Sequence, residues 1–477
     1  MIRRLPLVLI AIIFGFCGCT LAPKYERPKA PVSEKWPEGA AYKDIQIPAG
    51  AEKASELGWM GFFTDPNLQK IIKTALESNR DLRVAALNIE KARALYGIQR
   101  GELFPSFNTI GSASAQRIPA DLSSTGDSRT SEQYSVNFGI TSWEIDFFGR
   151  IRSLKDRALE EYLATDQAHL SARILLISAV AQAYLTLCAD RENLKIAKMT
   201  FEAQKEGYTL IKRRYEIGLA SELDLYRSQT QVDSAQGDIA RLTQVVAQDE
   251  NALRLLMGIS AEALPVAEDL GEIIPPRDIS AGMSSDVLLS RPDIVAAEHR
   301  LKAANANIGA ARAALFPRIS LTTTVGTASS ELSGLFGSGS GTWSFAPQII
   351  APIFDARLWA AYDATKVERE LSVALYEKAI QAAFREVSDS LAVKGTVEKQ
   401  LYCQKSLVDA LEKTYRLSIL RYEKGIDSYL GVLDAQRSLY SAQQGLVAIK
   451  LARLANQVKF YAVLGGGVRD SSEASAK

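Results

Sequence analysis

Residues 421–443, RYEKGIDSYLGVLDAQRSLYSAQ, repeat the pattern of residues 214–236, RYEIGLASELDLYRSQTQVDSAQ. A second pair of stretches occurs in the same order. Asp81 opens DLRVAALNIEKARALYGIQRGELFP and Asp293 opens DIVAAEHRLKAANANIGAARAALFP, each with its Asp 24 residues before its final Pro. Chance rarely preserves both order and spacing, so the sequence predicts two tandem structural repeats.

Glycines after the two RYE motifs predict sharp turns at the ends of long helices. Gly218 and Gly425 each stand two residues after the glutamate of the motif, and glycine readily adopts the left-handed conformation that ends a helix. Ser221 and Asp224 match a capping box for the returning helix. The plainer alternative is that both turns are helix caps without any further role.

The segments before these turns, residues 150–218 and 356–425, contain no proline and are rich in Ala, Leu, Glu, Lys, Arg and Gln. Apolar positions recur in them at helical spacing. A helix of ~68 residues is roughly 100 Å long at 1.5 Å per residue. Ordinary globular helices are several times shorter, so this length favours a coiled, tube-like assembly.

The most apolar stretch, residues 174–188, resembles a membrane helix in composition. Ser178, Gln182 and Thr186 nevertheless lie four residues apart and form one polar stripe along it. A helix packed between neighbours, with one face towards water, fits this pattern better. The core helix of a soluble bundle is the alternative.

Four other stretches alternate apolar and small polar residues with a period of two, as β-strands do. In one of them Tyr134, Val136 and Phe138 alternate with serine, asparagine and glycine. Alternation over ~10 residues is typical of membrane-barrel strands, and a solvent-exposed sheet is the alternative. Exposed loops are predicted at 118–130 and 329–341. The strand pairs are predicted at 104–117 with 132–145 and at 317–328 with 341–352.

Four strands cannot close a membrane barrel, because the smallest have ~8 strands and are filled by their own side chains. Two chains would therefore give a plugged barrel, whereas three would give twelve strands and room for a lumen. We expect a homotrimer whose helices continue the pore as a hollow bundle on one side of the membrane.

The N-terminus has the layout of a secretory signal: Arg3 and Arg4, then an apolar run from Leu5 to Phe16. That run is shorter than the ~20 residues that a transmembrane helix needs; a membrane anchor or a buried helix is the alternative. Gly18 before Cys19 resembles a bacterial lipobox, in which the cysteine is acylated and begins the mature chain. Thr20, rather than Asp, suggests passage to the outer membrane.

The remaining composition excludes several classes of function. The formal charge is +1 without a Lys/Arg cluster, which argues against nucleic acid. The only histidines are His169 and His299, and no CxxC, HExxH or Gly-rich phosphate-loop motif occurs near them, so we predict no metal site, no nucleotide site and no enzyme chemistry. Both histidines are expected on helix surfaces. Cys188 and Cys403 are expected to be buried and unpaired, with a bridge between them as the alternative.

Taken together, these stretches resemble the outer-membrane factors of bacterial tripartite efflux pumps, the TolC/OprM-like lipoproteins. The resemblance spans nearly the whole mature chain. It implies an α+β membrane protein: a trimeric tube with a twelve-strand barrel in the outer membrane, an α-helical barrel in the periplasm, and a mixed equatorial domain. It rests on CTLAPKYERP (19–28), LGWMGFFTDPNLQKII (57–72), RPDIVAAEHRLKAANANIGAARAALFPRISL (291–321) and RYEKGIDSYLGVLDAQRSLYSAQ (421–443).

The resemblance also implies a periplasmic gate in the second repeat. Leu430, Asp434 and Arg437 lie on one helical face, and the positions of Leu430 and Asp434 form the constriction in the family. Arg437 and Tyr422 would tie neighbouring helices together. Gly431 stands where TolC-type members often carry a second acid, which implies a weaker charge ring. An exposed Asp434–Arg437 ion pair is the alternative reading.

The implied partners are a periplasmic adaptor, an inner-membrane pump of the RND type, and outer-membrane lipid; no cofactor is expected besides the diacylglycerol and N-acyl (palmitate-type) lipid on Cys19. The exported substrate, whether drug, metal ion or another compound, cannot be read from a conduit. A passive porin is the nearest rival in transport class, and an adaptor protein is a second. The adaptor is expected to contact the turns at Gly218, Gly425, Arg214, Tyr215 and Arg421.

The expected organisation has six parts along the chain. They are a signal peptide (1–18), a lipid-anchored N-terminal extended or equatorial segment (19–66), repeat 1 (67–258), an equatorial linker (259–284), repeat 2 (285–465) and a flexible tail (466–477).

Overall fold

The computed structural model describes residues 20–43, 54, 57–124, 126–260, 264–280 and 285–467. The predicted signal peptide, the lipidation site at Cys19 and most of the predicted tail lie outside these residues. The fold is mostly helical, with one small sheet in the described part of the chain. It comprises two compact units, one made of residues 1–29, 88–166 and 296–376 and the other of residues 30–87, 167–295 and 377–477.

Four helices contribute residues to both units. Two are short, and two are the long helices that the proline-free segments predict. Their length follows from uninterrupted helix formers and from the absence of proline, which would remove a backbone hydrogen bond. These four are α4 (Arg80–Gly101), α5 (Arg150–Glu216), α7 (Pro292–Ala313) and α8 (Ala356–Glu423).

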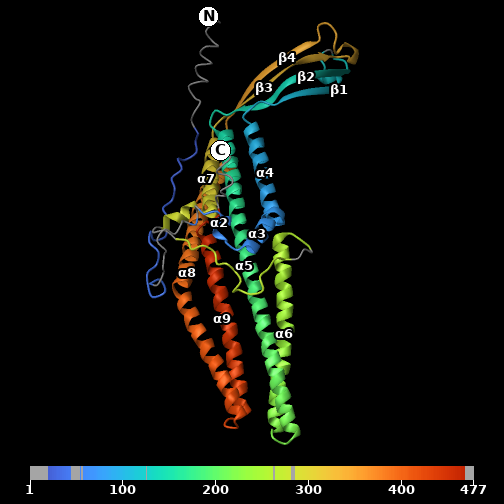
Figure 1. Cartoon of the computed structure of the whole chain (residues 1–477). Coiled ribbons are helices and arrows are strands. Elements are labelled where there is room, and N and C mark those ends of the chain that lie inside the picture. The colour runs from blue at the N-terminus through green and yellow to red at the C-terminus, as the bar shows by residue number, and fades with distance from the viewer. Residues whose placement is uncertain are drawn as a thin grey trace. The chain divides into compact units, whose positions relative to one another are not determined.

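The first unit contains an antiparallel sheet in the order β1-β2-β3-β4, which Figure 1 shows as one curved layer. The central pairing, β2 with β3, joins the two halves of the chain that the sequence predicts to be repeats. A register shift between Ile140 and Trp143 accompanies the positive φ of Ser142, so β2 bends at this point. The strands end within three residues of the predicted limits. They are β1 (Phe107–Ile118), β2 (Arg129–Ile145), β3 (Arg318–Ser329) and β4 (Gly341–Ile350).

The two edge strands of this sheet are exposed on both faces. Residues 107–117 of β1 and all of β4 are exposed, and neither strand has a second strand neighbour in the described residues. Their outer backbone groups are therefore available for further pairing.

The segment that follows Cys19 runs along α7 in the same unit. The Asn305 side chain donates to the Pro23 carbonyl over 2.7 Å, and Arg312 donates to the Leu21 carbonyl over 3.3 Å. Gly309 permits the close approach, because a Cβ there would lie 2.7 Å from the Cβ of Ala22. Residues 20–27, called the strap below, are thus fixed by polar contacts and by one small residue.

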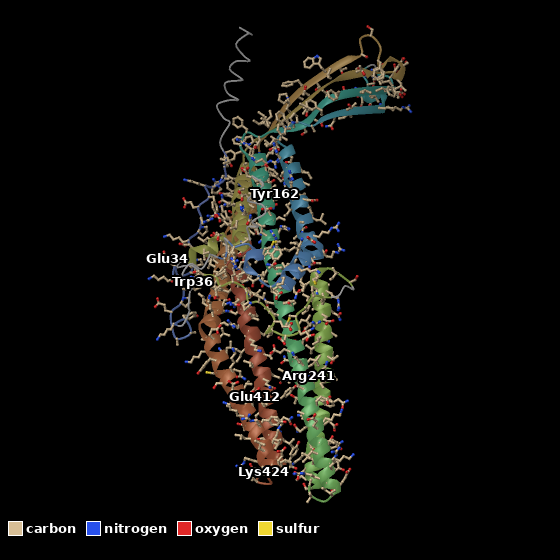
Figure 2. All side chains as sticks on the ribbon, viewed as in Figure 1. Glu34, Trp36, Tyr162, Arg241, Glu412 and Lys424 are labelled. Atoms are coloured by element: carbon tan, nitrogen blue, oxygen red, sulfur yellow. The ribbon has the colours of Figure 1, made fainter. Side chains whose placement is uncertain are left out.

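The second unit is built on two helical hairpins, α5–α6 and α8–α9, whose turns lie at the same end of the unit (Figure 1). Its core at the other end contains Phe62 stacked on Tyr461, with ring centroids 4.0 Å apart. Trp36, labelled in Figure 2, stacks on Phe384 of α8, with ring centroids 5.3 Å apart. The remaining elements are α6 (Glu222–Met257), α9 (Tyr429–Val463), α2 (Trp59–Phe62), α3 (Pro66–Ser78) and a short 3-10 helix (Ser285–Ser290).

α5 is the one helix in the described residues that is long and apolar enough to cross a membrane, and more than half of its most apolar window is buried. Its polar stripe only partly faces water. Ser178 is buried and accepts a hydrogen bond from Gln182 over 2.9 Å, whereas Gln182 itself is exposed. The stretch is therefore a packed helix with a narrow polar edge.

Three expectations about single residues need correction. Cys403 is exposed rather than buried, while Cys188 is buried; both thiols are free, so they form no bridge. Burial raises the pKa of Cys188 to about 12, which makes this thiol unreactive. The histidines are half-buried rather than on the surface, and His299 Nδ1 lies 2.6 Å from Glu160.

Candidate functional site at the helix turns

The turns of the two hairpins have the same backbone geometry. Gly218 has φ +79° and Gly425 has φ +70°, values that favour glycine. The amide after each glycine donates back to the arginine carbonyl of the RYE motif, Leu219 to Arg214 over 2.7 Å and Ile426 to Arg421 over 2.9 Å. The repeated sequence thus produces a repeated helix end.

The residues after the glycines differ between the two turns. In the first, the Ser221 hydroxyl accepts from the Asp224 amide over 3.1 Å, the predicted cap of α6. In the second, Ser428 makes no side-chain cap, and Gly431 stands at the position of Asp224. This turn is instead closed by an ion pair between Arg421 and Asp427.

The first turns of α9 have a buried face and an exposed face. Tyr429, Val432 and Leu433 are buried. Asp434 and Arg437 are exposed and form an ion pair of 2.6 Å, and Leu430 on the same face is 45% exposed. α9 therefore presents one apolar and two charged side chains away from the body of its own chain.

The buried face of α9 joins the two hairpins. Tyr429, Val432 and Leu433 form a cluster with Ile211 of α5, and Tyr415 and Ile419 of α8 pack against it. Because the cluster draws residues from α5, α8 and α9, the two turns are held together by apolar burial.

A cation–π contact borders this cluster. The Arg214 guanidinium lies 4.8 Å from the centroid of the Tyr422 ring, and Tyr422 in turn lies 5.0 Å from Tyr429. The arginine and the tyrosine come from α5 and α8, so the contact also connects the two hairpins.

Apolar side chains are exposed at the turns themselves. Ile217 is 69% exposed, Leu219 73% and Ile426 61%. Tyr215 is exposed beside them. Such a group of uncovered apolar residues at one end of a unit indicates an interaction site.

The structure brings together some of the residues predicted from sequence. Arg214 and Tyr422 are in contact, and Leu430, Asp434 and Arg437 share one exposed face. Among the described residues, however, Arg437 pairs with Asp434 of its own helix and not with a neighbouring helix.

Sequence reasoning missed Tyr429 and Ile211, which form the buried joint. One signal was available: Tyr429 stands where the first repeat has Glu222, so the two copies differ by an aromatic residue at this turn.

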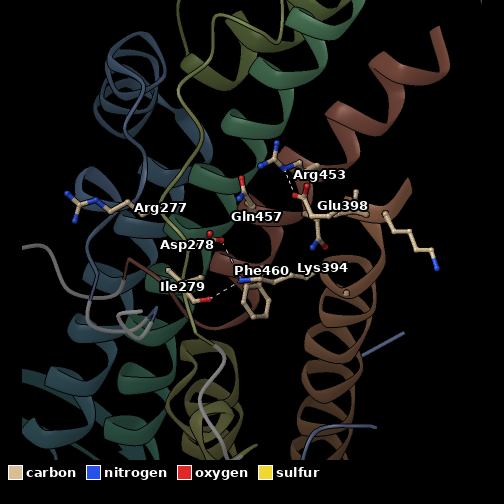
Figure 3. Close-up of a pocket in the computed structure, with 12 residues that line it drawn as sticks. Arg277, Asp278, Ile279, Lys394, Glu398, Arg453, Gln457 and Phe460 are labelled. Atoms are coloured by element: carbon tan, nitrogen blue, oxygen red, sulfur yellow. Dashed lines mark hydrogen bonds and ion pairs between the residues drawn. The ribbon is translucent and has the colours of Figure 1, made fainter. Parts of the chain in front are cut away.

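A cavity of about 470 Å³ in the second unit lies between residues 277–279, α8 and α9 (Figure 3). Its carboxylates are paired: Glu398 lies 2.7 Å from Arg453, and Asp278 lies 3.5 Å from Lys394. The described lining residues contain no cysteine, serine or histidine, and the described residues hold no cluster that could bind a metal ion.

A family model described as "Outer membrane efflux protein" matches residues 71–259 and 283–466. The chain is 48% identical to the probable efflux pump outer membrane protein TtgC of Pseudomonas putida over 467 residues, 97% of this chain and 95% of that protein. It is 39% identical to outer membrane protein OprJ of Pseudomonas aeruginosa over 464 residues, 96% of this chain and 95% of that protein.

Solved structures are similar over nearly the whole chain. The Neisseria gonorrhoeae MtrE outer membrane channel in its open state has a TM-score of 0.84 and 38% identity, and the match covers 94% of this chain and 99% of MtrE. CusC has a TM-score of 0.83 and 38% identity, and the match covers 94% of this chain and 100% of CusC.

Proposed function

This chain belongs to the outer membrane efflux protein family, and we propose that three copies of it form the exit channel of a tripartite, RND-type efflux system, gated at the helix turns. It is an outer-membrane component of an efflux pump in a Gram-negative bacterium, and not an enzyme. The channel would conduct small molecules or ions from the periplasm-spanning pump to the outside.

The observation that carries the proposal is the open-edged sheet. A sheet in a bilayer must close on itself, because unpaired backbone groups cost several kcal/mol each in hydrocarbon. β1 and β4 are both open and, as first and last of four antiparallel strands, run in opposite directions. The β4 edge of one copy is therefore suited to antiparallel pairing with β1 of the next, and three copies would close a twelve-strand barrel with a lumen.

The side chains of β4 support a lipid-facing surface. Trp343 is 80% exposed, and Phe345 and Ile349 lie on the same face of the strand, two and six residues further on. Aromatic and aliphatic residues in this alternation are suited to hydrocarbon and the membrane interface.

A stripe on α8 supports assembly beside the barrel. Val367, Leu371 and Leu375 are four residues apart, on one face of the helix, and all are exposed in the single chain. A neighbouring copy would cover this stripe. Burial of such large aliphatic side chains stabilises association by about 1.5–3 kcal/mol each when it is complete.

The exposed face of α9 is proposed as the periplasmic gate. In a trimer Leu430 and Asp434 would each occur three times around the axis, giving a narrow apolar ring beside an acidic one. An acidic ring attracts cations and resists close approach unless it is neutralised, and the Arg437 partner of each Asp434 would supply that neutralisation. The ring would be weaker than one with a second acid, because Gly431 occupies that position.

The exposed turns are proposed to receive a periplasmic adaptor, which would connect the channel to the inner-membrane pump. Ile217, Leu219 and Ile426 supply apolar area, and the exposed Arg421–Asp427 pair supplies a polar rim. Cys19 is proposed to carry the lipid. The strap that begins at Thr20 is fixed to the unit that contains the sheet.

The gate is tested by single-channel conductance of the full-length protein in planar bilayers. The variant Leu430→Ala with Asp434→Ala should conduct several-fold more than the native channel, because both rings are removed. Leu223→Ala at the matching position of the first repeat is the control. Unchanged conductance of the double variant would refute the proposed gate and favour a passive pore. Heat-sensitive trimers in outer-membrane fractions test the assembly separately.

A further inference from the structure

Gly207 occupies the interior of α5, nine residues before the helix ends. Glycine there destabilises a helix by about 1 kcal/mol relative to alanine, because it loses more backbone freedom. The neighbouring structure gives a reason for it. A Cβ built at Gly207 would lie 2.3 Å from the hydroxyl oxygen of Tyr429 and 3.6 Å from its Cζ.

Tyr429 therefore points its hydroxyl at the one position on α5 that lacks a side chain. The tyrosine is only 8% exposed and belongs to the cluster with Ile211. Burial, followed by the influence of Tyr415 and Tyr422, raises its pKa to about 12, so the hydroxyl stays neutral. The Tyr429 side chain packs into the space that the missing side chain of Gly207 leaves on α5, called the hole below.

Tyr429 also immediately precedes Leu430 on α9. One residue faces α5 and the next faces away from the chain, because successive residues on a helix point about 100° apart. A rotation or slide of α9 relative to α5 would withdraw Tyr429 from the hole at Gly207.

The equivalent contact, with the roles of the two repeats exchanged, cannot form. Thr414 stands at the position of Gly207 in the second repeat, and Glu222 stands at the position of Tyr429 in the first. The inserted tyrosine, Tyr429, therefore has no counterpart in the first repeat, and the glycine that accommodates it, Gly207, has no counterpart in the second.

We propose that the insertion of Tyr429 against Gly207 is a steric lock that holds α9 against α5, and that withdrawal of Tyr429 is a required step in opening the proposed gate. The inference rests on the proposed gate at Leu430 and Asp434, and it adds two positioning residues outside the constriction.

The lock is tested with a pair of substitutions that compensate each other. Gly207→Ala introduces a Cβ at 2.3 Å from the tyrosine hydroxyl and should displace Tyr429, giving a several-fold rise in single-channel conductance of the full-length trimer. Tyr429→Phe removes only that hydroxyl and leaves the space at Gly207 partly unfilled, so it should raise conductance by less than Gly207→Ala does. In Gly207→Ala/Tyr429→Phe the nearest ring atom lies at the ordinary contact distance of Cζ, 3.6 Å, so conductance should return to the native value.

Gly237→Ala is the matched control. It is also a glycine inside a helix, but its Cβ would meet nothing within 4 Å. It should gain the same intrinsic helix propensity as Gly207→Ala without any rise in conductance. Equal conductance of the two alanine variants would overturn the lock, and so would a Gly207→Ala effect that the phenylalanine does not reverse.

Comparison with the double variant of the gate separates this inference from its premise. If Leu430→Ala with Asp434→Ala raises conductance while Gly207→Ala does not, the gate stands and the lock fails. If neither does, the proposed gate itself fails. Should Gly207→Ala not assemble, Tyr429→Ala decides, because it empties the hole without overpacking it; native conductance of that variant would refute the lock.

Discussion

Arg214 of the first hairpin covers the ring of Tyr422 in the second, with 4.8 Å between the guanidinium carbon and the ring centroid. The two residues come from helices that the chain separates by about two hundred positions, and Tyr422 packs against the apolar cluster around Tyr429. Tyr422 is therefore part of the joint between the hairpins, and its partner is an arginine of the first RYE motif.

Arg214→Ala should loosen this joint without unfolding the chain. A cation–π contact at a partly exposed site contributes about 0.5–1 kcal/mol, so amide hydrogen exchange at the end of α8 should accelerate up to roughly fivefold, whereas the melting temperature should change little. Arg214→Lys should give an intermediate rate, because lysine retains the charge but not the planar stacking. The exposed Arg213→Ala is the control; if it accelerates exchange as much, the contact has no specific role.

A carboxyl pair in the α5–α6 hairpin should make stability depend on pH. Burial, then a hydrogen bond to Asp190 and its negative charge, raises the pKa of Asp249 to about 6. Asp249 Oδ2 is buried and has no partner in the described residues unless one carboxyl is protonated. Because this folded pKa lies above the ~3.9 of an unfolded aspartate, the stabilisation is fully present below about pH 4 and is lost as the pH rises through about 6.

Asp249→Asn keeps the shape of the protonated acid and should remove that dependence. The melting temperature of the variant should exceed the native one at pH 8, and the difference should shrink as the pH falls towards 5. Asp233→Asn, an exposed aspartate on the same helix, should show no such trend. The prediction is contradicted if the melting temperature of the native protein does not fall, relative to that of Asp249→Asn, between pH 5 and pH 8. In that case Asp190 and Asp249 do not hold a proton between them.

The strap should be released when Glu298 is neutralised. Burial alone would raise the pKa of Glu298, but the hydrogen bond from Arg27, the Lys302 charge and the hydrogen bond from Tyr25 outweigh it and lower the pKa. Tyr25 donates over 3.1 Å and Arg27 Nε over 3.0 Å. Because the folded pKa is depressed, this stabilisation is present above the ordinary glutamate range and is lost as the pH falls through the folded pKa.

Glu298→Gln should therefore expose residues 20–27 to limited proteolysis at neutral pH, while the sheet and the trimer persist. Tyr25→Phe should have a smaller effect, because Arg27 still holds the carboxylate. Glu26→Gln on the exposed side of the strap should resist cleavage like the native chain; equal cleavage of Glu298→Gln and Glu26→Gln would rule out the clamp.

Bulky residues at the turn glycines should abolish adaptor crosslinking. Gly425→Val forces a branched residue to φ +70°, at a cost of at least about 1–2 kcal/mol for the left-handed conformation. The turn would rearrange and lose the exposed surface at Ile426, whereas the sheet and the helices would still assemble as trimers. Gly218→Val should behave alike. Gly431→Ala, which lies in a helix with open space around its Cβ, should crosslink normally. Retained crosslinking of Gly425→Val would refute the docking site.

Local pattern accounts for much of the fold and part of the site. The alternation around Tyr134 and the uninterrupted run before Gly218 are properties of neighbouring residues, and the strands and helices follow them within a few positions. The left-handed turns were predictable because glycine alone adopts that conformation without strain. Leu430, Asp434 and Arg437 share a face because their spacing matches the helical period.

Exposure was predictable only where one face of a helix is clearly apolar. Cys403 lies in a helix whose hydrophobic positions are spread around its circumference, so spacing gave no correct side for the thiol. His299 is half-buried, and its Nδ1 lies 2.6 Å from Glu160, a residue 139 positions earlier in the sequence. Neither result follows from the residues adjacent to them.

The sequence by itself determined the strands, the long helices and the glycine turns, because each depends on backbone preference and on periodicity over short distances. Only the tertiary structure decided which surfaces meet. It placed Tyr429 against Gly207, Arg214 over Tyr422 and the strap on Glu298, and it left β1 and β4 open. These contacts join residues far apart along the chain, and their energy comes from burial and close packing, which no local pattern records.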